Sequence, residues 1–517
     1  MYPEYWAEKF PEKPAAINSE TGESLSYREL SDRCNRFVNL MRDRGIVRGD
    51  TIAVLMENNL RFFEVMWAAL SSGLYVTPIN KFLNSEEVSY IVNDSDAKLL
   101  VTSRALKSVA EELPTRCPAC QHFLAVDGEV NGYEVFESAT LLHSTVIEGQ
   151  RPFGDFMNYS SGITGRPKGI KLPLRDVTVD NPKTPLGRIH KDLWDFDDAT
   201  VYLSTAPLYH SAPSAFAAST HKWGGTVVMM PRFDPSEALQ AIEKHHVTHS
   251  QWVPTMFIRM LKLPEEERSK YNLSSLRFAV HLAAPCPVEI KKAMLAWWGE
   301  VIYEVYGGTE LNGSTHATPR DWLQNPGTVG KPMLGVVHIC DDDGNEVAVN
   351  QSGTVYFELP RLRFQYHKDP GQTRNAVHPT HPNWSSLGDV GYVNDRGFLF
   401  LNDRKTFMIN SGGVNIYPQE IEDALVQHPK IEDVAVIGVH NDDMGEEVKA
   451  IVQLSRGEQA SDALAEEIIA FARTKLAKFK VPKSVDFTDE LPRLPTGKLY
   501  KNKLRDKYWS DRKSRII

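Results

Sequence analysis

Short apolar runs alternate with amphipathic stretches along the first 300 residues. Runs of β-branched and other apolar residues at 51–56, 75–79, 225–230 and 277–282 predict buried strands. Residues 61–70 and 287–298 are predicted to form helices. Strands that alternate with helices in this way favour an α/β fold with largely parallel sheets.

One helix start carries a specific signal. Asp234 is a capping residue, Pro235 follows at the first helical position, and Glu237 lies three residues after the cap. The apolar positions Leu239, Ile242 and Val247 are expected to continue this helix.

The pattern of predicted elements changes after about residue 400, where charged helices and short strands dominate. Strands are predicted at 433–439 and 448–454, and a helix at 462–476. Because 517 residues exceed the size of a single core, at least two domains are expected. We predict a large N-terminal domain at 1–403, with layered, partly parallel sheets flanked by helices. A small, mobile α+β C-terminal domain is predicted at 404–517.

Composition and charge narrow the classes of function. Hydrophobic residues make up 42% and charged residues 24%, which is typical of a folded soluble protein. No apolar run approaches the roughly 18 residues of a membrane helix. The formal charge is 58 minus 67, or -9, which argues against nucleic acid as the main partner. The N-terminus lacks signal-peptide features, so a cytoplasmic location is expected, with peripheral membrane contact left open.

The cysteines do not indicate a disulfide framework, because they are few and odd in number: Cys34, Cys117, Cys120, Cys286 and Cys340. Cys117 and Cys120 form a CxxC near His122. No second CxxC completes a zinc site, so two thiols in a loop are favoured over a metal or redox role.

The sharpest chemical signal lies at 159–169. Small and hydroxylic residues there can wrap an anion with backbone N–H groups and hydroxyls, and Lys168 adds a positive charge. The spacing matches neither the Walker pattern nor GxGxxG. Taken alone, a loop of Gly, Ser and Thr residues is more often a flexible turn than a phosphate-binding loop.

Further motifs follow in a fixed order at 306–310, 386–392, 403–405, 411–422 and 494–498. Together with 159–169, they resemble the adenylate-forming enzymes: acyl-CoA ligases, stand-alone adenylation domains and firefly-type luciferases. The resemblance covers residues from about 20 to 505. It implies that a carboxylate attacks the α-phosphate of ATP with Mg²⁺, and pyrophosphate leaves. Coenzyme A then takes the acyl group from the adenylate, and AMP departs.

The resemblance also assigns roles. Thr309 would contact the α-phosphate, and Glu310 and Thr164 would hold Mg²⁺. Tyr306 and Gly307 would lie at the adenine, and Asp389 and Arg404 at the ribose. The β- and γ-phosphates would be held by Ser160, Ser161, Gly162, Thr164, Gly165 and Lys168. Taken singly, Tyr306 could be a core aromatic, Asp389 a turn residue and Glu310 a solvated carboxylate.

Lys498 is the strongest candidate for a catalytic residue. An ammonium can bridge the attacking carboxylate and the α-phosphate and offset the charge that accumulates between them. The competing interpretation is a solvated basic tail with Lys501, Lys503 and Arg505. The resemblance implies a hinge near Arg404 and a pantetheine tunnel lined by Ser411, Gly412 and Gly413.

Three departures from the family pattern stand out. Ile163 replaces a threonine of the phosphate loop, which removes one hydroxyl. Thr406 stands where the hinge often has Asp or Lys. Ala283 and Ala284 stand where the family often has Gly-Gly, and their methyl groups could reshape the adenine and acyl pocket.

The class of acid is inferred from the acyl pocket. Residues 206–213 resemble the family segment that opens this pocket. His210 occupies the gate position, and Ser211 follows it; a core histidine is the alternative. Small residues at 214–219 fit either close helix packing or a roomy pocket. Trp252 is expected to line the same acyl pocket, which is therefore predicted to be apolar. No Asp is available to pair with an amino acid's ammonium.

We therefore expect an acid–thiol ligase for a bulky apolar acid, of the fatty, aryl-alkanoic or steroid type, which releases its product as a CoA thioester. A luciferase-like oxygenase and a non-catalytic nucleotide-binding module are the alternatives. A homodimer is the default expectation for a soluble enzyme.

Overall fold

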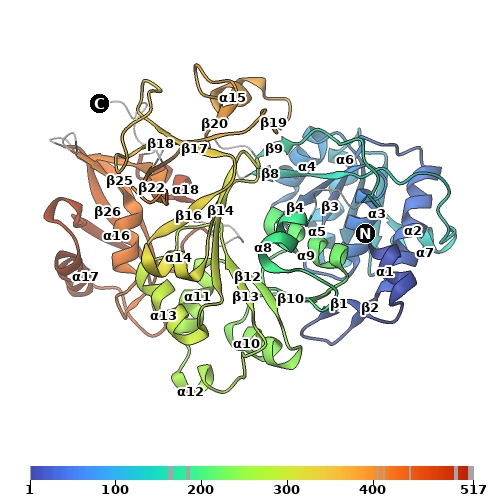
Figure 1. Ribbon diagram of the computed structural model, residues 1–517, viewed down its shortest axis with the longest axis horizontal. Helices are drawn as coiled ribbons and strands as arrows, with labels where there is room; N and C mark the ends of the chain where they lie inside the picture. Colours follow the sequence, from blue (N-terminus) through green and yellow to red (C-terminus); the bar gives the residue numbers. More distant parts are fainter. Residues whose placement is uncertain are drawn as a thin grey trace.

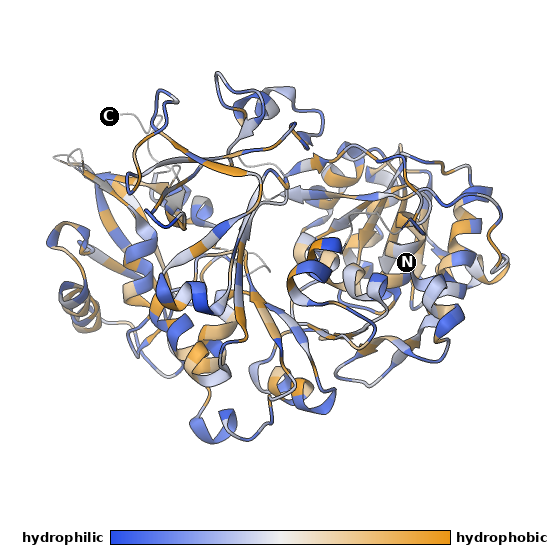
Figure 2. Cartoon of the chain, in the orientation of Figure 1, coloured by the Kyte–Doolittle hydropathy of each residue, from blue (hydrophilic) through white to orange (hydrophobic). Residues whose placement is uncertain are grey.

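The strands of the computed structural model form three sheets (Figure 1). The structure describes residues 2–160, 167–181, 187–404, 407–411, 414–441, 444–493 and 499–509. Figure 2 shows apolar residues concentrated on the strands and on helix faces that pack against them.

Sheet one is mixed and has 14 strands within the described residues. Strands β1, β11, β10, β12, β13 and β14 pair in parallel, whereas the pairs from β14 to β17 are antiparallel. Its order is β17 (Val336–Cys340), β18 (Gly353–Glu358), β21 (Asp389–Val393), β22 (Leu399–Arg404), β16 (Thr328–Leu334), β15 (Ser314–Ala317), β14 (Ile302–Gly307), β13 (Phe278–His281), β12 (His249–Trp252), β10 (Val201–Ser204), β11 (Thr226–Met229), β1 (Pro14–Asn18) and β2 (Ser24–Ser26), with β20 (Trp384–Ser385) beside β18.

Sheet two is covered by helices on both faces. Its order is β19 (Gln365–Tyr366), β9 (Lys168–Lys171), β8 (Asp155–Ser160), β4 (Tyr75–Ile79), β3 (Thr51–Leu55), β5 (Ala97–Ser103), β6 (His122–Val126) and β7 (Glu134–Val135). On β3, Ile52 and Val54 pack with helices α2 (Tyr27–Asp43) and α3 (Arg61–Leu70). The alternate residues Ala53 and Leu55 pack with α4 (Ser85–Asp94) and α6 (Leu113–Arg116) on the other face.

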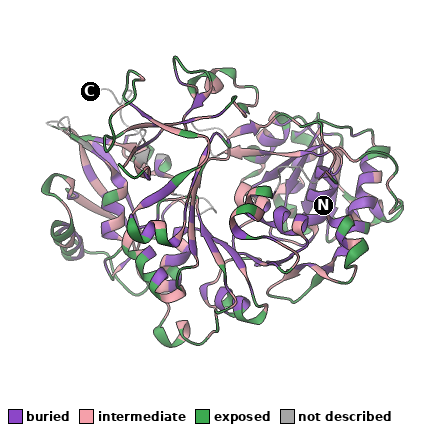
Figure 3. Ribbon diagram, viewed as in Figure 1, coloured by how far each residue is buried: buried purple, intermediate pink, exposed green. Residues whose placement is uncertain are grey.

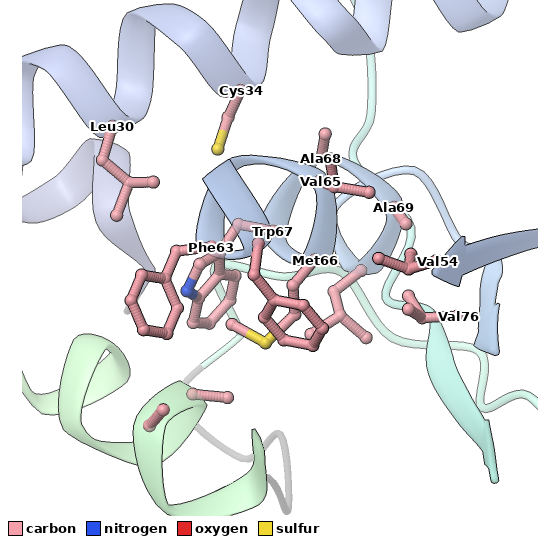
Figure 4. Packing of buried hydrophobic residues seen from close by; sticks show 14 of the residues in the cluster. Leu30, Cys34, Val54, Phe63, Val65, Met66, Trp67, Ala68, Ala69 and Val76 are labelled. Atoms are coloured by element: carbon pink, nitrogen blue, oxygen red, sulfur yellow. The ribbon is translucent and has the colours of Figure 1, made fainter. Parts of the chain in front are cut away.

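The hydrophobic cluster that contains Ile52, Val54 and residues of α2 and α3 lies between sheets one and two. Figure 4 shows Trp67 and its neighbours on α3 against Leu30 and Cys34 of α2 and Val54 and Val76 of sheet two. Trp67 Nε1 donates to His221 Nδ1 at 3.0 Å. This bond links α3 to α9 (Ser211–Trp223), the helix that precedes β11 of sheet one. The buried strands at the centre of both layers are visible in Figure 3.

Sheet three forms a smaller α+β unit. Its order is β24 (Val414–Ile416), β23 (Ile409–Ser411), β26 (Gly445–Leu454) and β25 (Ile431–Asn441), with β27 (Ser484–Thr488) beside β26. Helices α16 (Pro418–Leu425) and α17 (Asp462–Lys475) share its core, and α18 (Lys501–Trp509) packs on β25. Lys262, which follows α11, donates to the backbone oxygens of Ile431 (3.1 Å) and Glu432 (3.2 Å) and to the Glu432 carboxylate (3.0 Å).

The remaining α-helices complete the layers. They are α1 (Pro3–Lys9), α5 (Lys107–Ala110), α7 (Phe136–Leu141), α8 (Arg188–Trp194), α10 (Pro235–Lys244), α11 (Pro254–Leu261), α12 (Glu265–Arg268), α13 (Val288–Trp298), α14 (Pro319–Gln324) and α15 (Pro370–Asn375). None of the described helices is long and apolar enough to cross a membrane.

The predicted α/β class is confirmed, with partly parallel sheets and a smaller C-terminal α+β part. Asp234 caps α10 as expected, because its Oδ1 accepts from the backbone N–H groups of Ser236 and Glu237. The expectation that this helix continues through Val247 is wrong. The helix ends at Lys244, and His246 adopts a left-handed φ of 49° that a helix cannot continue through. The 403/404 boundary and the mobility of the smaller part stay predictions.

Candidate nucleotide and acyl site

Tyr306 and Asp389 meet in sheet one, although 83 residues separate them. Tyr306 lies near the end of β14 and Asp389 begins β21, and the tyrosine hydroxyl donates to Asp389 Oδ2 at 2.6 Å. Asp389 is buried, and its Cα partner across the ladder is Arg404 of β22. Tyr306, Asp389 and Arg404, three of the four residues expected at the adenine and ribose, therefore come from adjacent parts of one sheet.

The turn after β14 brings a second group together. Glu310 is buried, with 8% of its surface exposed, and its Oε1 accepts from the Tyr366 hydroxyl at 2.9 Å. Thr309 Oγ1 lies 3.3 Å from Ser211 Oγ, which joins this turn to the start of α9. Gly307 is exposed at the end of β14.

Gly308 allows two motifs to touch. A Cβ at this position would lie 2.1 Å from Leu387 Cδ1 and 2.7 Å from Glu310 Oε2. A side chain at this position would require the ends of both side chains to shift, so glycine lets the turn pack closely against the segment that leads into Asp389.

Lys168 and Ser160 face each other across a hairpin. They are Cα partners in the antiparallel pair of β8 and β9, at the mouth of the intervening loop. The Lys168 ammonium lies 5.7 Å from the centre of the Tyr366 ring. Burial lowers the pKa of Lys168, and the carboxylates of Asp369 and Glu310 oppose that shift. Lys168, Tyr366 and Glu310 therefore form one continuous group.

Several predicted residues lie outside the described residues: Ser161, Gly162, Thr164, Gly165, Gly412, Gly413 and Lys498, with the departures Ile163 and Thr406. Ser411 ends β23 and pairs with Gly445 of β26, in sheet three.

Tyr209, which is buried, and His210, which is half-buried, precede Ser211 and pack against each other. His210 Nε2 and the Tyr209 hydroxyl are both buried, and within the described residues neither has a hydrogen-bond partner. Their ring centres are 4.7 Å apart. Burial lowers the pKa of His210 to about 4, so the imidazole is neutral at pH 7. The small residues that follow, Ala217 and Ala218, are fully buried in the core.

The structure does not bring Trp252 to this group. Its ring is fully buried among Phe233, Phe257 and Trp298, and its Nε1 donates to Ser250 Oγ at 2.7 Å. The bulk and hydrophobicity that suggested a pocket lining are also those of a core residue.

Ala283 and Ala284 follow β13 on a turn. Ala283 is exposed and has a φ of 76°, a conformation that favours glycine, and Ala284 is half-buried. The first of the two alanines that depart from the family pattern therefore adopts a glycine-like backbone. Because an alanine at this φ crowds its own backbone, Ala283 is expected to be strained.

Sequence reasoning did not select Tyr366. It lies 56 residues after Glu310, outside the motifs that carry the family resemblance. Only the pairing of β19 with β9 places its ring between the two sheets.

The five cysteines are free and buried. Burial raises the pKa of Cys117 to about 11 and that of Cys120 to about 12. Among the described residues, no group of three or more His, Cys, Asp or Glu side chains could hold a metal ion.

Comparison with known proteins identifies the family. The model of the AMP-binding enzymes matches residues 3–366, and that of the AMP-binding enzyme C-terminal domain matches residues 420–498. A long-chain-fatty-acid–CoA ligase of Bacillus subtilis (strain 168) is 28% identical over 96% of this chain and 92% of the relative. A feruloyl-CoA synthase of Amycolatopsis sp is 31% identical over 94% of each chain.

A solved structure agrees with these relatives. ATP-bound MatB from Rhodopseudomonas palustris superposes with a TM-score of 0.81 at 27% identity, over 98% of this chain and 99% of that one. The predicted superfamily and the predicted acid–thiol ligase class are confirmed. The chain belongs to the AMP-binding enzyme family, and it is an AMP-forming acyl-CoA synthetase.

Proposed function

We propose that this ligase activates a bulky apolar carboxylic acid, and that the residues grouped above carry out the reaction. The observation that carries the proposal is the junction of Tyr306, Asp389 and Glu310 at the end of β14. Asp389 would accept from the ribose hydroxyls, with its carboxylate oriented by Tyr306. Thr309 and Ser211 would lie where the α-phosphate meets the acid.

Glu310 has the chemistry that a Mg²⁺ site requires. Mg²⁺ binds through one or two carboxylates together with phosphate oxygens and waters. One Glu310 oxygen accepts from Tyr366, and Gly308, which has no side chain of its own, lies beside the other. When bound, the ion would offset negative charge on the phosphates. Lys168 would add a fixed positive charge on the opposite side of Tyr366.

Two observations support an apolar acid. The stretch 204–223 contains no Asp or Glu, so an amino acid's ammonium would be buried there without a counter-charge. His210 and Tyr209 present neutral rings to the same region. The fatty, aryl-alkanoic and steroid acids are the classes that suit such a surface.

The organisation of the chain is part of the same proposal. The proposed domains are 1–403 and 404–517, and the chain passes from β22 of sheet one, which ends at Arg404, to β23 of sheet three, which begins at Ile409, close to this boundary. The free cysteines support a reducing, cytoplasmic location. The expected homodimer would give a doubled mass in light scattering, and a single-chain mass of 58.3 kDa would exclude it.

The test is pyrophosphate release with ATP and Mg²⁺ across fatty, aryl and steroid acids, each with and without coenzyme A. CoA-dependent turnover on one class would establish the substrate class. Oxygen uptake and light without coenzyme A would favour the luciferase-like alternative. ATP binding without pyrophosphate release from any acid would favour a nucleotide-binding module.

Variants then separate the roles. Lys498→Ala should reduce adenylation strongly and leave thioester formation from supplied acyl-adenylate nearly intact, and Lys503→Ala, an exposed lysine on α18, is the matched control. Equal loss in both half-reactions would contradict the role of Lys498. Asp389→Ala should weaken ATP binding, and unchanged affinity would contradict the ribose contact.

A further inference from the structure

Tyr366 lies between two proposed nucleotide-binding groups that belong to different sheets. Its hydroxyl donates to Glu310 Oε1 at 2.9 Å, on the turn that follows β14 of sheet one. Its ring centre lies 5.7 Å from the ammonium of Lys168, which begins β9 of sheet two. One side chain thus contacts both the proposed metal-binding carboxylate and the proposed phosphate-binding lysine.

The backbone of Tyr366 is fixed on sheet two. Tyr366 is the Cα partner of Ile170 where β19 pairs with β9, and its N–H donates to Thr373 Oγ1 at 3.0 Å. The N–H of Asp369 donates to the Tyr366 carbonyl at 3.2 Å. The buried Phe364 packs edge-on against the tyrosine ring, with centres 5.4 Å apart. These contacts leave the ring little freedom to turn.

The turn after Tyr366 is anchored to the same sheet. The N–H of His367 donates to the Gly169 carbonyl at 2.7 Å. Lys368 adopts a left-handed φ of 55°, and its ammonium donates to the Asp94 carbonyl at 2.7 Å and to Asp96 Oδ1 at 2.9 Å. Tyr366 therefore follows sheet two, while the carboxylate that it holds follows sheet one.

We propose that Tyr366 is a positioning residue, which orients the Glu310 carboxylate for Mg²⁺ and fixes its separation from Lys168. This inference rests on the roles given to Glu310 and Lys168 in the proposed function. A carboxylate that binds a metal is oriented by its own hydrogen-bond donors, and loss of such a partner typically costs about 10- to 100-fold in metal affinity or activity. The hydroxyl occupies one Glu310 oxygen and leaves the other for the cation.

Tyr366→Phe removes the hydroxyl and keeps the ring. We expect its ATP affinity with Mg²⁺, measured by titration calorimetry, to fall by about 10-fold, with ATP affinity in EDTA unchanged. In steady-state assays the Mg²⁺ concentration for half-maximal pyrophosphate release should rise by a similar factor, and KM for the acid should stay constant. A purely structural role would weaken binding with and without metal alike.

The matched control is Tyr271→Phe. Tyr271 also donates to a glutamate Oε1, that of Glu267, at 2.9 Å, but it lies after α12 and outside the site. This variant should match the wild type in both titrations. A Mg²⁺-dependent loss in Tyr271→Phe equal to that in Tyr366→Phe would overturn the proposal.

A double-mutant cycle with Glu310→Gln gives the second test. If Tyr366 acts through Glu310, adding Tyr366→Phe to Glu310→Gln should cause less than a twofold further loss of Mg²⁺-dependent ATP affinity. Fully multiplicative losses, or wild-type metal dependence in Tyr366→Phe, would overturn the inference. Failure of the wild type to release pyrophosphate from any acid would instead refute the proposed function, because the calorimetry needs no turnover.

Discussion

A buried ion pair with a histidine beside it joins α13 to β14, the strand that carries the nucleotide motif. Lys291 on α13 is fully buried, and its ammonium donates to Glu304 Oε2 on β14. His281 Nε2 lies 3.3 Å from the same oxygen. Burial alone would raise the pKa of Glu304, but the neighbouring Lys291 and His281 outweigh burial and hold that pKa at about 2. The carboxylate is therefore ionised in the core.

Lys291→Met removes the cation and leaves the Glu304 charge buried. Breaking a buried ion pair in this way costs about 3–5 kcal/mol. The net pKa shift of Glu304, from 4.5 to about 2, combines burial with the effects of Lys291 and His281, and at about 1.4 kcal/mol per unit it is of the same order, about 3 kcal/mol. Because the folded pKa is the lower one, this contribution is complete above pH 4.5 and is lost as the pH falls towards 2.

The assay is thermal unfolding at pH 7, with Lys292→Met as the control. Lys292 neighbours Lys291 on α13 but is half-exposed, and its ion pair with Glu289 at 2.8 Å is worth at most about 1 kcal/mol. At about 2 °C per kcal/mol for a large domain, Lys291→Met should lower the Tm by roughly 6–10 °C and Lys292→Met by about 2 °C or less. Adding Glu304→Leu to Lys291→Met should recover most of the loss. Equal shifts in the two lysine variants, or no recovery, would refute the reasoning.

Three further predictions concern other features of the chain. Ala283→Gly relieves a left-handed alanine and should raise the free energy of unfolding by about 0.5–1 kcal/mol, seen as a higher Tm; a lower Tm would contradict the strain. Lys262→Ala removes the contacts to Ile431 and Glu432, so limited trypsin digestion that releases the smaller domain should run about two- to fivefold faster, and an unchanged rate would show that the contact carries no energy. Cys117 and Cys120 have raised pKa values and are buried, so they should react with a disulfide reagent at pH 8 only after denaturation; rapid reaction of the folded protein would contradict this.

Local signals in the sequence predicted local structure well. The helix at 61–70 and the strand at 75–79 have the predicted bounds, because each is a short, mainly apolar run followed by polar or turn-forming residues. The antiparallel half of sheet one was not foreseen. Its strands, such as β15 and β16, are short and half-buried, and strand direction is set by long-range pairing that no local pattern records.

The site, like the fold, divides into features that sequence motifs predict and features that depend on tertiary structure. The order of the motifs indicated which residues belong together, and Tyr306 and Asp389 do meet. Trp252 was selected for its apolar bulk, which does not distinguish a pocket wall from a core residue. Tyr366 was missed because its importance comes from the register of β19 on β9, a feature of tertiary structure.

The N-terminal strand has a consequence for synthesis of the protein. β1 pairs with β11, Ala16 opposite Val227, and Trp6 of α1 donates to the Lys222 carbonyl at 2.9 Å. Because about 210 residues separate these partners, a ribosome working at about 5–20 residues per second delivers β11 roughly 10–40 s after β1. During that interval the core side chains of this segment, such as Trp6 and Ala16, lack their partners and remain accessible to chaperones. A chain truncated before residue 27 would leave β11 as an open sheet edge, where a second molecule could add a strand and start aggregation.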